Sequence, residues 1–321
     1  MMERGALPSP LDAGSVAIGV MAYNEEANIG HLLDSLLHQT ADERISRIVV
    51  VASGCTDRTC EIVRAYAARD SRVELAAEAE RGGKVLAVNE FFRHASEPIL
   101  LISAADLVYS PQAVEKITDP LVDERLGIVG SHPVPLNRAD HFIGFVVNLM
   151  WKLHHQVSLA SPKMGEVIAF RNVFRGLDPN RLADEVQIEY GIRAIGYEAA
   201  YAPEAIVYNR GPGTVREFVA QRTRWYAYNL QMQRDCRFPV STNTISNVAR
   251  AAWRVLRDDH PRLDWFVGAA LLEAYCRVAG AFASRGLNRP ERRLWTPHAS
   301  TKVLVEEPSS TERSVPSQVR M

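Results

Sequence analysis

The sequence predicts an α/β fold in which a mostly parallel β-sheet is flanked by helices and followed by a helical C-terminal extension. Between residues 15 and 103, short apolar runs alternate with polar or glycine-containing turns and with segments whose apolar residues recur at helical spacing. The runs are rich in Val, Ile and Leu, as expected of parallel strands covered on both faces. We therefore expect strands at residues 16–21, 48–52, 73–76 and 99–103.

The segments between these runs have the period of amphipathic helices. Their apolar positions are Ile29, Leu32, Leu33, Leu36 and Leu37 in the first, Ile62, Val63, Tyr66 and Ala67 in the second, and Val85, Val88, Phe91 and Phe92 in the third. In an open parallel sheet, functional loops lie beyond the carboxyl ends of the strands. The loops that follow the four expected strands should therefore converge on one crevice.

After about residue 127 the order of elements changes. We expect a strand at 128–131, a long apolar helix, a strand at 167–170 and a helix at 184–195. From residue 287 the chain is polar and rich in Pro, Ser, Arg and Glu, and so buries too little apolar surface to order itself well. The predicted organisation is an N-terminal tail at 1–14, a domain at 15–235 with halves at 15–126 and 127–235, a helical extension at 236–286 and a largely flexible tail at 287–321.

Composition and charge argue against several classes of protein. A net charge of −1 over 321 residues gives no indication of nucleic-acid binding. The four cysteines form no C-x-x-C pair and do not cluster with histidines at zinc spacing, so we expect neither a disulfide scaffold nor a structural metal, and a cytoplasmic location. Residues 1–13 lack the basic and apolar regions of a leader, and no apolar run reaches the roughly 20 residues of a spanning helix.

Two apolar segments, residues 142–151 and 265–282, leave two interpretations open. They are either buried core helices or helices that lie against the inner face of a membrane. We favour buried core helices, because charges are scarce in both segments and interfacial helices usually carry a strongly basic polar face.

The string Gln221-Arg222-Thr223-Arg224-Trp225 has the pattern Q-x-x-R-W. Residues three and four apart share a helix face, so Gln221, Arg224 and Trp225 should point the same way. An arginine can bind a phosphate through two N–H groups, and a tryptophan offers a flat apolar face with one donor. The alternative is an ordinary amphipathic helix whose tryptophan packs into a core.

Polar residues follow the first two expected strands. Tyr23, Asn24 and Glu25 belong to a Y-N-E-E string that is expected to open a helix, where N–H groups are free. Ser53 and Asp57 belong to the turn S-G-C-T-D-R-T. Helix capping alone would also explain both strings.

Three further strings carry charge. Lys84 follows two glycines at a helix start, where amides and an ammonium together attract phosphate. Asp106 ends the fourth expected strand, and Mg²⁺ needs only one or two protein carboxylates when phosphates and water complete its shell. Asp184 and Glu185 begin a helix, where a carboxylate could accept a proton from a hydroxyl. A basic loop and helix N-terminal charges are the plainer explanations.

Taken in order, these strings resemble those of the family-2 inverting glycosyltransferases, which have the Rossmann-like GT-A fold. The resemblance covers about residues 15–233, and the Q-x-x-R-W string is typical of members with cellulose- and hyaluronan-synthase-like acceptor sites. It implies that residues 15–126 bind a nucleotide sugar, with a UDP-sugar favoured, and that residues 127–235 bind the acceptor.

The resemblance also implies a role for each residue. Asp106 would hold Mg²⁺ or Mn²⁺, Glu185 would be the general base with Asp184 as the alternative, and Gln221 and Trp225 would meet the acceptor. The donor pocket would be lined by Tyr23, Asn24, Glu25, Ser53, Asp57, Lys84, Asp106 and Arg224.

The sequence departs from the family pattern at three places. Ala104 stands where the first aspartate of D-x-D is expected, and Ser53 where an aspartate begins the D-G-S-T-D turn. The acidic pair Asp184-Glu185 reads Asp-Glu where Glu-Asp is expected. The first departure puts the metal dependence in question, and the last leaves open which acid takes the proton.

The sequence thus predicts a metal-assisted hexosyltransferase that moves one sugar from a nucleoside-diphosphate donor to a hydroxyl of a small-molecule, lipid-linked or glycan acceptor. Single transfer is favoured because processive members of the family carry transmembrane helices. A catalytically impaired nucleotide-sugar-binding partner protein is one alternative, suggested by Ala104. Nucleotidyl transfer is another, disfavoured because no glycine-rich signature lies near the N-terminus.

Overall fold

The computed structural model describes residues 14–181, 183–238, 245–286 and 299–304. Its centre is a sheet of eight strands in the order β3-β2-β1-β4-β7-β6-β8-β5. The strands are β1 (Val16–Ala22), β2 (Ile45–Ser53), β3 (Val73–Glu78), β4 (Ile99–Ala104), β5 (Leu107–Tyr109), β6 (Leu126–Pro135), β7 (Ile168–Arg171) and β8 (Glu198–Asn209).

The first half of the sheet is parallel, as the alternating pattern predicts. Strand β1 pairs in parallel with β2 and β4, and β2 pairs in parallel with β3. All seven residues of β1 are buried, because helices cover both faces. The four strands expected in this half are confirmed, and the carboxyl ends of β1, β2 and β4 point to one edge of the sheet.

The second half of the sheet is mixed. Strand β7 runs antiparallel to both β4 and β6, β5 runs antiparallel to β8, and β6 pairs in parallel with β8. The sequence predicts β6 and β7 but not β5 or β8. Strand β5 has only three residues, and Pro203 interrupts the alternation along β8.

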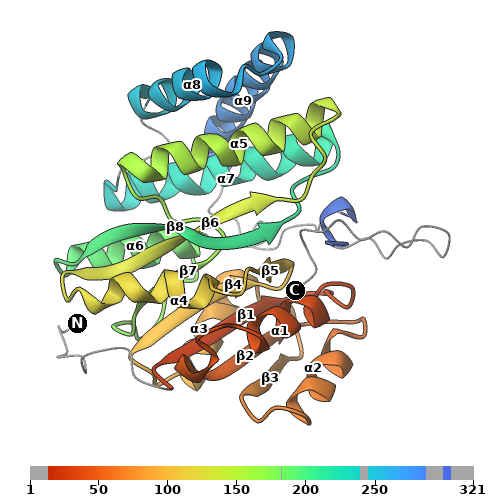
Figure 1. Ribbon diagram of the computed structural model, residues 1–321, viewed down its shortest axis with the longest axis vertical. Coiled ribbons are helices and arrows are strands. Elements are labelled where there is room, and N and C mark those ends of the chain that lie inside the picture. Colours follow the sequence, from red (N-terminus) through yellow and green to blue (C-terminus); the bar gives the residue numbers. More distant parts are fainter. Residues whose placement is uncertain (1–13, 182, 239–244, 287–298, 305–321) are drawn as a thin grey trace.

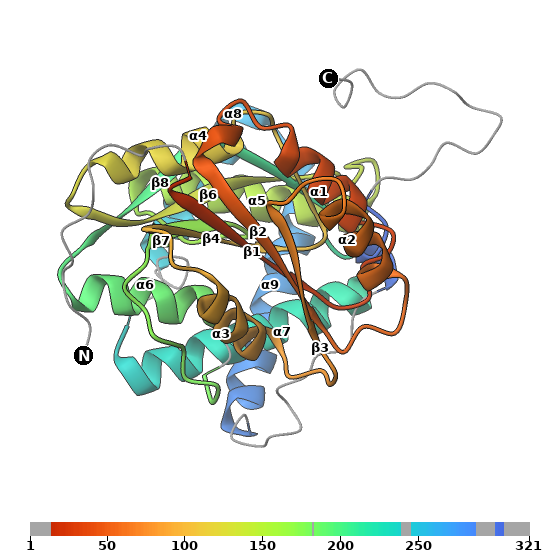
Figure 2. The ribbon, with the colours of Figure 1, turned by 90° about the horizontal axis from the view of Figure 1, so that it is seen from below.

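Helices on the two faces of the sheet form two cores. Helices α1 (Ile29–Leu37), α2 (Thr59–Ala67) and α4 (Ala113–Thr118) pack on one face, and α3 (Lys84–His94) and α6 (Asp184–Ala194) pack on the other (Figure 2). The predicted helix at 184–195 is therefore present. Helix α1 begins at Ile29, so the Y-N-E-E string forms a loop before the helix and not its first turn.

Helices α5 (Phe142–Ala160) and α7 (Val215–Cys236) form a layer beyond the second half of the sheet, and α8 (Ile245–Asp259) and α9 (Leu263–Ala283) pack outside this layer (Figure 1). Residues 142–151 of α5 are all buried or half-buried in the structure, in agreement with the core helix expected there. The expectation that residues 265–282 form a buried core helix is wrong. Helix α9 leaves a row of apolar side chains more than half exposed, namely Leu263, Val267, Leu271, Tyr275, Val278 and Phe282.

The charges of α9 explain this orientation. Glu273 pairs with Arg222 of α7 at 3.0 Å, and Arg277 pairs with Glu273 at 3.3 Å. The polar side of α9 is thus turned toward α7, which leaves the apolar side outward. By length and composition α9 could span a membrane, the one helix among the described residues that could, and 17% of its most apolar 18-residue window is buried.

Residues 299–304 depart from the flexible tail expected at 287–321. Leu304 is 1% exposed, and the backbone N–H of Leu304 donates to the Asn28 side chain at 2.8 Å. The sequence gives no sign of this contact because the segment has no periodic apolar pattern. The remainder of the predicted tail and residues 1–13 of the N-terminal tail lie outside the described residues.

Candidate active site

Two adjoining cavities lie at the carboxyl edge of the sheet. The smaller, of about 220 Å³, is lined by the end of β2 and by the loops after β1, β3 and β4, and the larger, of about 730 Å³, lies between that edge and helices α5, α7, α8 and α9. Their linings share Gly83, Lys84, Met150, Trp151, Glu166 and Gln221. Three of the four loops expected to converge therefore line this crevice, and β2 reaches it through its last residue, Ser53.

The small cavity collects most of the predicted donor residues. Tyr23 and Glu25 come from the loop after β1, Ser53 from the end of β2, and Asp106 from the turn after β4. The smaller cavity is therefore the candidate donor site, and its carboxylates lie where a phosphate-bound cation could sit.

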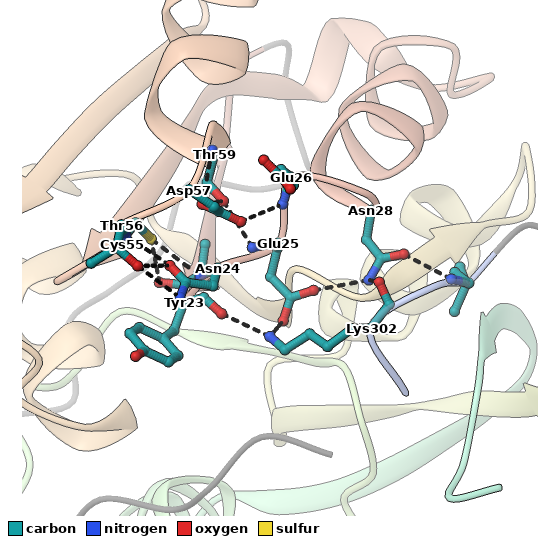
Figure 3. Close-up of polar contacts among 12 residues, drawn as sticks. Tyr23, Asn24, Glu25, Glu26, Asn28, Cys55, Thr56, Asp57, Thr59 and Lys302 are labelled. Atoms are coloured by element: carbon teal, nitrogen blue, oxygen red, sulfur yellow. Dashed lines mark hydrogen bonds and ion pairs between the residues drawn. The ribbon is translucent and has the colours of Figure 1, made fainter. Parts of the chain in front are cut away.

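Asn24 and Asp57 join two of the loops that surround this cavity (Figure 3). The Asn24 side chain accepts a hydrogen bond from the backbone N–H of Thr56 at 2.8 Å, and Asp57 accepts one from the N–H of Glu26 at 3.0 Å. Asp57 also accepts from the N–H of Thr59, at the start of α2. Neither side chain is among the described residues that line the two cavities. Their observed contacts fix the loops after β1 and β2 relative to each other.

The glycine-rich turn before α3 closes the small cavity from the side. Gly83 has φ of 93°, which favours glycine, and immediately precedes the first residue of α3, Lys84. The backbone N–H of Gly82 donates to the Ser53 hydroxyl at 3.2 Å. The Arg81 guanidinium stacks on the Tyr23 ring at 3.8 Å. This turn therefore places two cationic side chains at the cavity.

Lys84 bridges the two acids at the start of α6. Its Nζ lies 3.0 Å from Asp184 Oδ2 and 2.9 Å from Glu185 Oε1. Asp184 has a side-chain exposure of 3%, whereas Glu185 is 28% exposed, and both line the larger cavity. Burial and the charge of Glu185 raise the pKa of Asp184. For Glu185 burial acts in the same direction, but the Lys84 charge and the hydrogen bonds from Asp184, Lys84 and the backbone together outweigh it and lower the pKa.

The three carboxyl groups that line the small cavity, those of Glu25, Asp106 and Glu166, all have raised pKa values. Burial, then the charge of Asp106, raises the pKa of Glu25 to about 7, and the same two causes raise that of Glu166 to about 7. Burial also raises the pKa of Asp106. A divalent cation would relieve this mutual repulsion. No group of three His, Cys, Asp or Glu residues in the described ranges could hold a metal alone, so a cation here would need ligand oxygens as well.

The Q-x-x-R-W string lies on α7, as predicted, and faces the larger cavity. Thr214 caps α7 by accepting from the N–H of Glu217 at 3.2 Å. Gln221, Arg224 and Trp225 all line the larger cavity, and Gln221 lines the smaller one too. Arg224 therefore lines the cavity that also holds the acid pair but not the one that holds Asp106, and Gln221 lies at the junction of the two.

Three residues of the site lack a sequence signal that would have identified them. Glu166 precedes β7 and lines both cavities, and Lys302 reaches the donor cavity from the far end of the chain. Arg222, within the Q-x-x-R-W string, lies over the Trp225 ring with its guanidinium carbon 4.7 Å from the ring centroid, and pairs with Glu273 of α9. Only contacts between distant segments reveal them.

Parts of this chain are similar in sequence to known proteins. Residues 17–162 match the family model described as Glycosyl transferase family 2. The chain is 23% identical over 227 residues to the "Probable glycosyltransferase YdaM" of Bacillus subtilis, a match that covers 65% of this chain and 54% of that protein. It is 24% identical over 241 residues to an "N-acetylglucosaminyltransferase" of Rhizobium meliloti, covering 67% of this chain and 55% of that protein. The chain thus spans about half the length of the curated relatives it matches.

A solved structure supports the fold assignment. The "Mannosyltransferase PcManGT from Pyrobaculum calidifontis in complex with GDP-Man and Mn2+" superposes with a TM-score of 0.58 at 22% identity, over 85% of this chain and 87% of that one. The fold class expected from the sequence, an α/β fold of the GT-A type, is confirmed.

Proposed function

We propose that this chain is a family-2 inverting glycosyltransferase that transfers a single hexosyl group from a nucleoside-diphosphate sugar, favoured as a UDP-sugar, to an acceptor hydroxyl. The observation that carries the proposal is the junction of the two cavities: the candidate donor cavity, with Asp106, opens beside the acid pair and the Q-x-x-R-W helix. The matched family and the activities named for the relatives agree with this chemistry.

Glu185 is the proposed general base. Inversion requires the acceptor oxygen to attack the anomeric carbon on the face opposite the diphosphate while its proton passes to a carboxylate. Glu185 lines the larger cavity and is the more exposed member of the acid pair, so an acceptor hydroxyl can reach it. Asp184 remains the alternative base, because the same ammonium bridges both acids.

A divalent cation, Mg²⁺ or Mn²⁺, is proposed to be held by Asp106 and the donor phosphates. When bound it would stabilise negative charge on the leaving diphosphate. Glu166 lies in the same cavity and has a pKa of about 7, so it is a candidate second carboxylate in place of the acid missing at Ala104. Arg224 is proposed to reach the diphosphate from α7, next to Gln221 at the junction.

The acceptor side supports a substrate with a large apolar part. Apolar side chains from α5, α7, α8 and α9 dominate the larger cavity, and Trp225 lines the same cavity as the acid pair. Polar side chains also line this cavity, but most of its surface is apolar, which suits a lipid chain better than a free sugar. We therefore propose a lipid-linked acceptor whose hydroxyl meets Glu185, while Trp225 and Gln221 contact the group that bears it.

The outer side of α8 and α9 suits peripheral contact with the cytoplasmic face of a membrane. The exposed apolar row of α9 runs from Leu263 to Phe282, a length of about 30 Å. On α8, Trp253 is 68% exposed and is flanked in sequence by the exposed Arg250, Arg254 and Arg257. An apolar row beside a basic, aromatic surface is the composition of helices that lie at anionic lipid interfaces. Helices α8 and α9 occupy one end of the molecule (Figure 1).

The proposal is tested by a thermal-shift screen of UDP, GDP and their sugars with and without Mn²⁺, followed by a transfer assay with the donor that stabilises the protein. A ligand bound only by the folded state raises the melting temperature. We expect one nucleotide to give a shift that Mn²⁺ enlarges and that Asp106→Ala abolishes. If the donor binds but is neither transferred nor hydrolysed, the chain is a nucleotide-sugar-binding partner protein. A product with retained anomeric configuration contradicts the inverting mechanism.

A further inference from the structure

A segment from the end of the chain lies against the donor cavity. Residues 299–304, called here the C-terminal strap, are held by Asn28, which is fully buried between the first loop and α1. The Asn28 amide donates to the Lys302 carbonyl at 3.0 Å, and its oxygen accepts from the Leu304 N–H at 2.8 Å. One buried side chain thus fixes the backbone on both sides of Val303.

The other end of the strap is attached to α7. The Ser300 hydroxyl donates to the Glu217 carboxylate at 2.6 Å, and it accepts from the N–H of Gly213 at 2.9 Å. Glu217 lies in the first turn of α7, the helix that carries the Q-x-x-R-W string. The strap therefore joins the donor-side loop to the acceptor-side helix.

These attachments place Lys302 in the donor cavity. Its ammonium donates to the Tyr23 carbonyl at 2.7 Å and pairs with the Glu25 carboxylate (Figure 3). An ammonium has three N–H donors, and these contacts use two of them. Lys302 lines the same cavity as Asp106, with its side chain 25% exposed. One donor is available to a ligand in that cavity.

The charges that line the cavity indicate a role for Lys302. Glu25, Asp106 and Glu166 all line the cavity, and a diphosphate would add further negative charge. Lys84, the other lysine of its lining, is committed to the acid pair of α6. A diphosphate bound beside these carboxylates needs positive charges that offset the charge of the carboxylates and of the phosphates. The Lys302 ammonium supplies one such charge next to Glu25.

We propose that Lys302 is a donor-binding residue, and that the C-terminal strap delivers its ammonium to the diphosphate of the nucleotide sugar. The inference rests on the proposed function and adds to it a contact from outside the matched residues 17–162. With Ala104 in place of an acid, fewer protein oxygens hold a cation, so more of the diphosphate charge falls to side-chain donors such as Lys302.

The test compares a nucleotide with its nucleoside. Calorimetry in the presence of Mn²⁺ measures UDP and uridine binding to the full chain and to Lys302→Met, Lys302→Arg and the strap control Val303→Ala, with GDP and guanosine substituted if the wild type prefers them. Loss of a charge-assisted hydrogen bond should weaken UDP binding by at least about tenfold. We expect uridine binding to change less than about twofold, Lys302→Arg to recover most of the UDP affinity, and Val303→Ala to match the wild type, since a charge lost from the phosphate subsite leaves the nucleoside contacts intact.

Three results would overturn the inference. Equal loss of UDP and uridine affinity in Lys302→Met would make the lysine a structural support of the pocket, and unchanged UDP affinity would place its ammonium away from the phosphates. Tighter UDP binding by Lys302→Met would mean that the Lys302 side chain obstructs the donor site. Melting temperatures of the ligand-free variants show whether each is folded. A wild type that binds no nucleoside diphosphate contradicts the proposed function itself, which is a distinguishable result.

Discussion

The bridge from Lys84 to Asp184 and Glu185 gives a prediction that combines stability and pH. Lys84→Met removes the ammonium that lies 2.9–3.0 Å from both carboxylates, and leaves them facing each other. Breaking a buried ion pair costs about 3–5 kcal/mol. Since Lys84 is 33% exposed and Glu185 28% exposed, water offsets part of this cost, and we expect a loss near the lower end, about 3 kcal/mol at pH 7.

The loss should shrink as the pH falls. In the wild type Lys84 lowers the pKa of Glu185, so the stabilisation by that group is present above its unfolded pKa and lost only well below it. The pKa of Asp184 is already raised in the wild type, and in the variant burial and mutual repulsion raise that of Glu185 as well. The folded variant therefore retains about one proton more than the folded wild type and loses more stability as the pH rises. Over the two pH units from pH 7 to pH 5, one additional retained proton lowers the cost by up to about 2.8 kcal/mol, at about 1.4 kcal/mol per pH unit, so most of the loss expected at pH 7 should be absent at pH 5.

Urea denaturation at pH 5 and pH 7 measures both effects. The matched control is Lys152→Met, which removes a pair of similar length, 2.7 Å to Asp259, between side chains that are 56% and 40% exposed. Exposed pairs contribute about 0–1 kcal/mol, so this variant should lose little at either pH. If Lys84→Met costs no more than Lys152→Met, or if its cost is the same at both pH values, the electrostatic account of the acid pair is wrong.

Four further outcomes are expected. Glu185→Gln should reduce turnover by at least about a hundredfold and keep donor affinity, measured by single-turnover kinetics and calorimetry, and retained turnover would assign the base to Asp184. Trp225→Ala should raise KM for the acceptor with donor affinity kept, and equal loss of both would remove it from the acceptor site. Asp106→Asn should lower UDP affinity in Mn²⁺ much more than in EDTA, by calorimetry, and an equal effect in both would exclude it as the cation ligand. Leu271→Ser combined with Val278→Ser should reduce flotation with anionic vesicles without a change in transfer to a soluble acceptor, and unchanged flotation would refute the membrane surface.

Much of the fold could be predicted because its first half follows local rules. Apolar runs bounded by turns predict β1 to β4, and the strand ends predict where Tyr23, Ser53 and Asp106 meet. The second half was harder to predict because the antiparallel pairing of β7 with β4 and β6 depends on chain reversals that leave no period in the sequence. Strand β8 was missed for the related reason that its pattern is broken at Pro203.

Helix α9 shows why a correct helix can be given the wrong environment. Its apolar content predicts burial, and the scarcity of charges, with only Glu273 and Arg277 within residues 265–282, argues against an interfacial helix with a basic polar face. In the structure these charges face α7, where Glu273 bonds Arg222 and the Tyr226 hydroxyl, so the outward side is the apolar one. The direction of a helix face depends on its partner, and composition alone does not supply that information.

The same reasoning explains why the donor site could be only partly predicted. Residues that act through a local motif, such as Lys84 after its glycines, can be found because the backbone geometry and the chemistry share one short stretch. Lys302 lies 277 residues from Glu25, and its position depends on Asn28 accepting and donating one backbone hydrogen bond each. A substitution such as Asn28→Leu should therefore remove Lys302 from the cavity without altering the lysine, and reproduce the UDP-specific loss of Lys302→Met. That agreement would show that UDP binding depends on the contact between Asn28 and the C-terminal strap. Normal UDP affinity in Asn28→Leu would mean that the contact of Ser300 with Glu217 is enough to hold the strap.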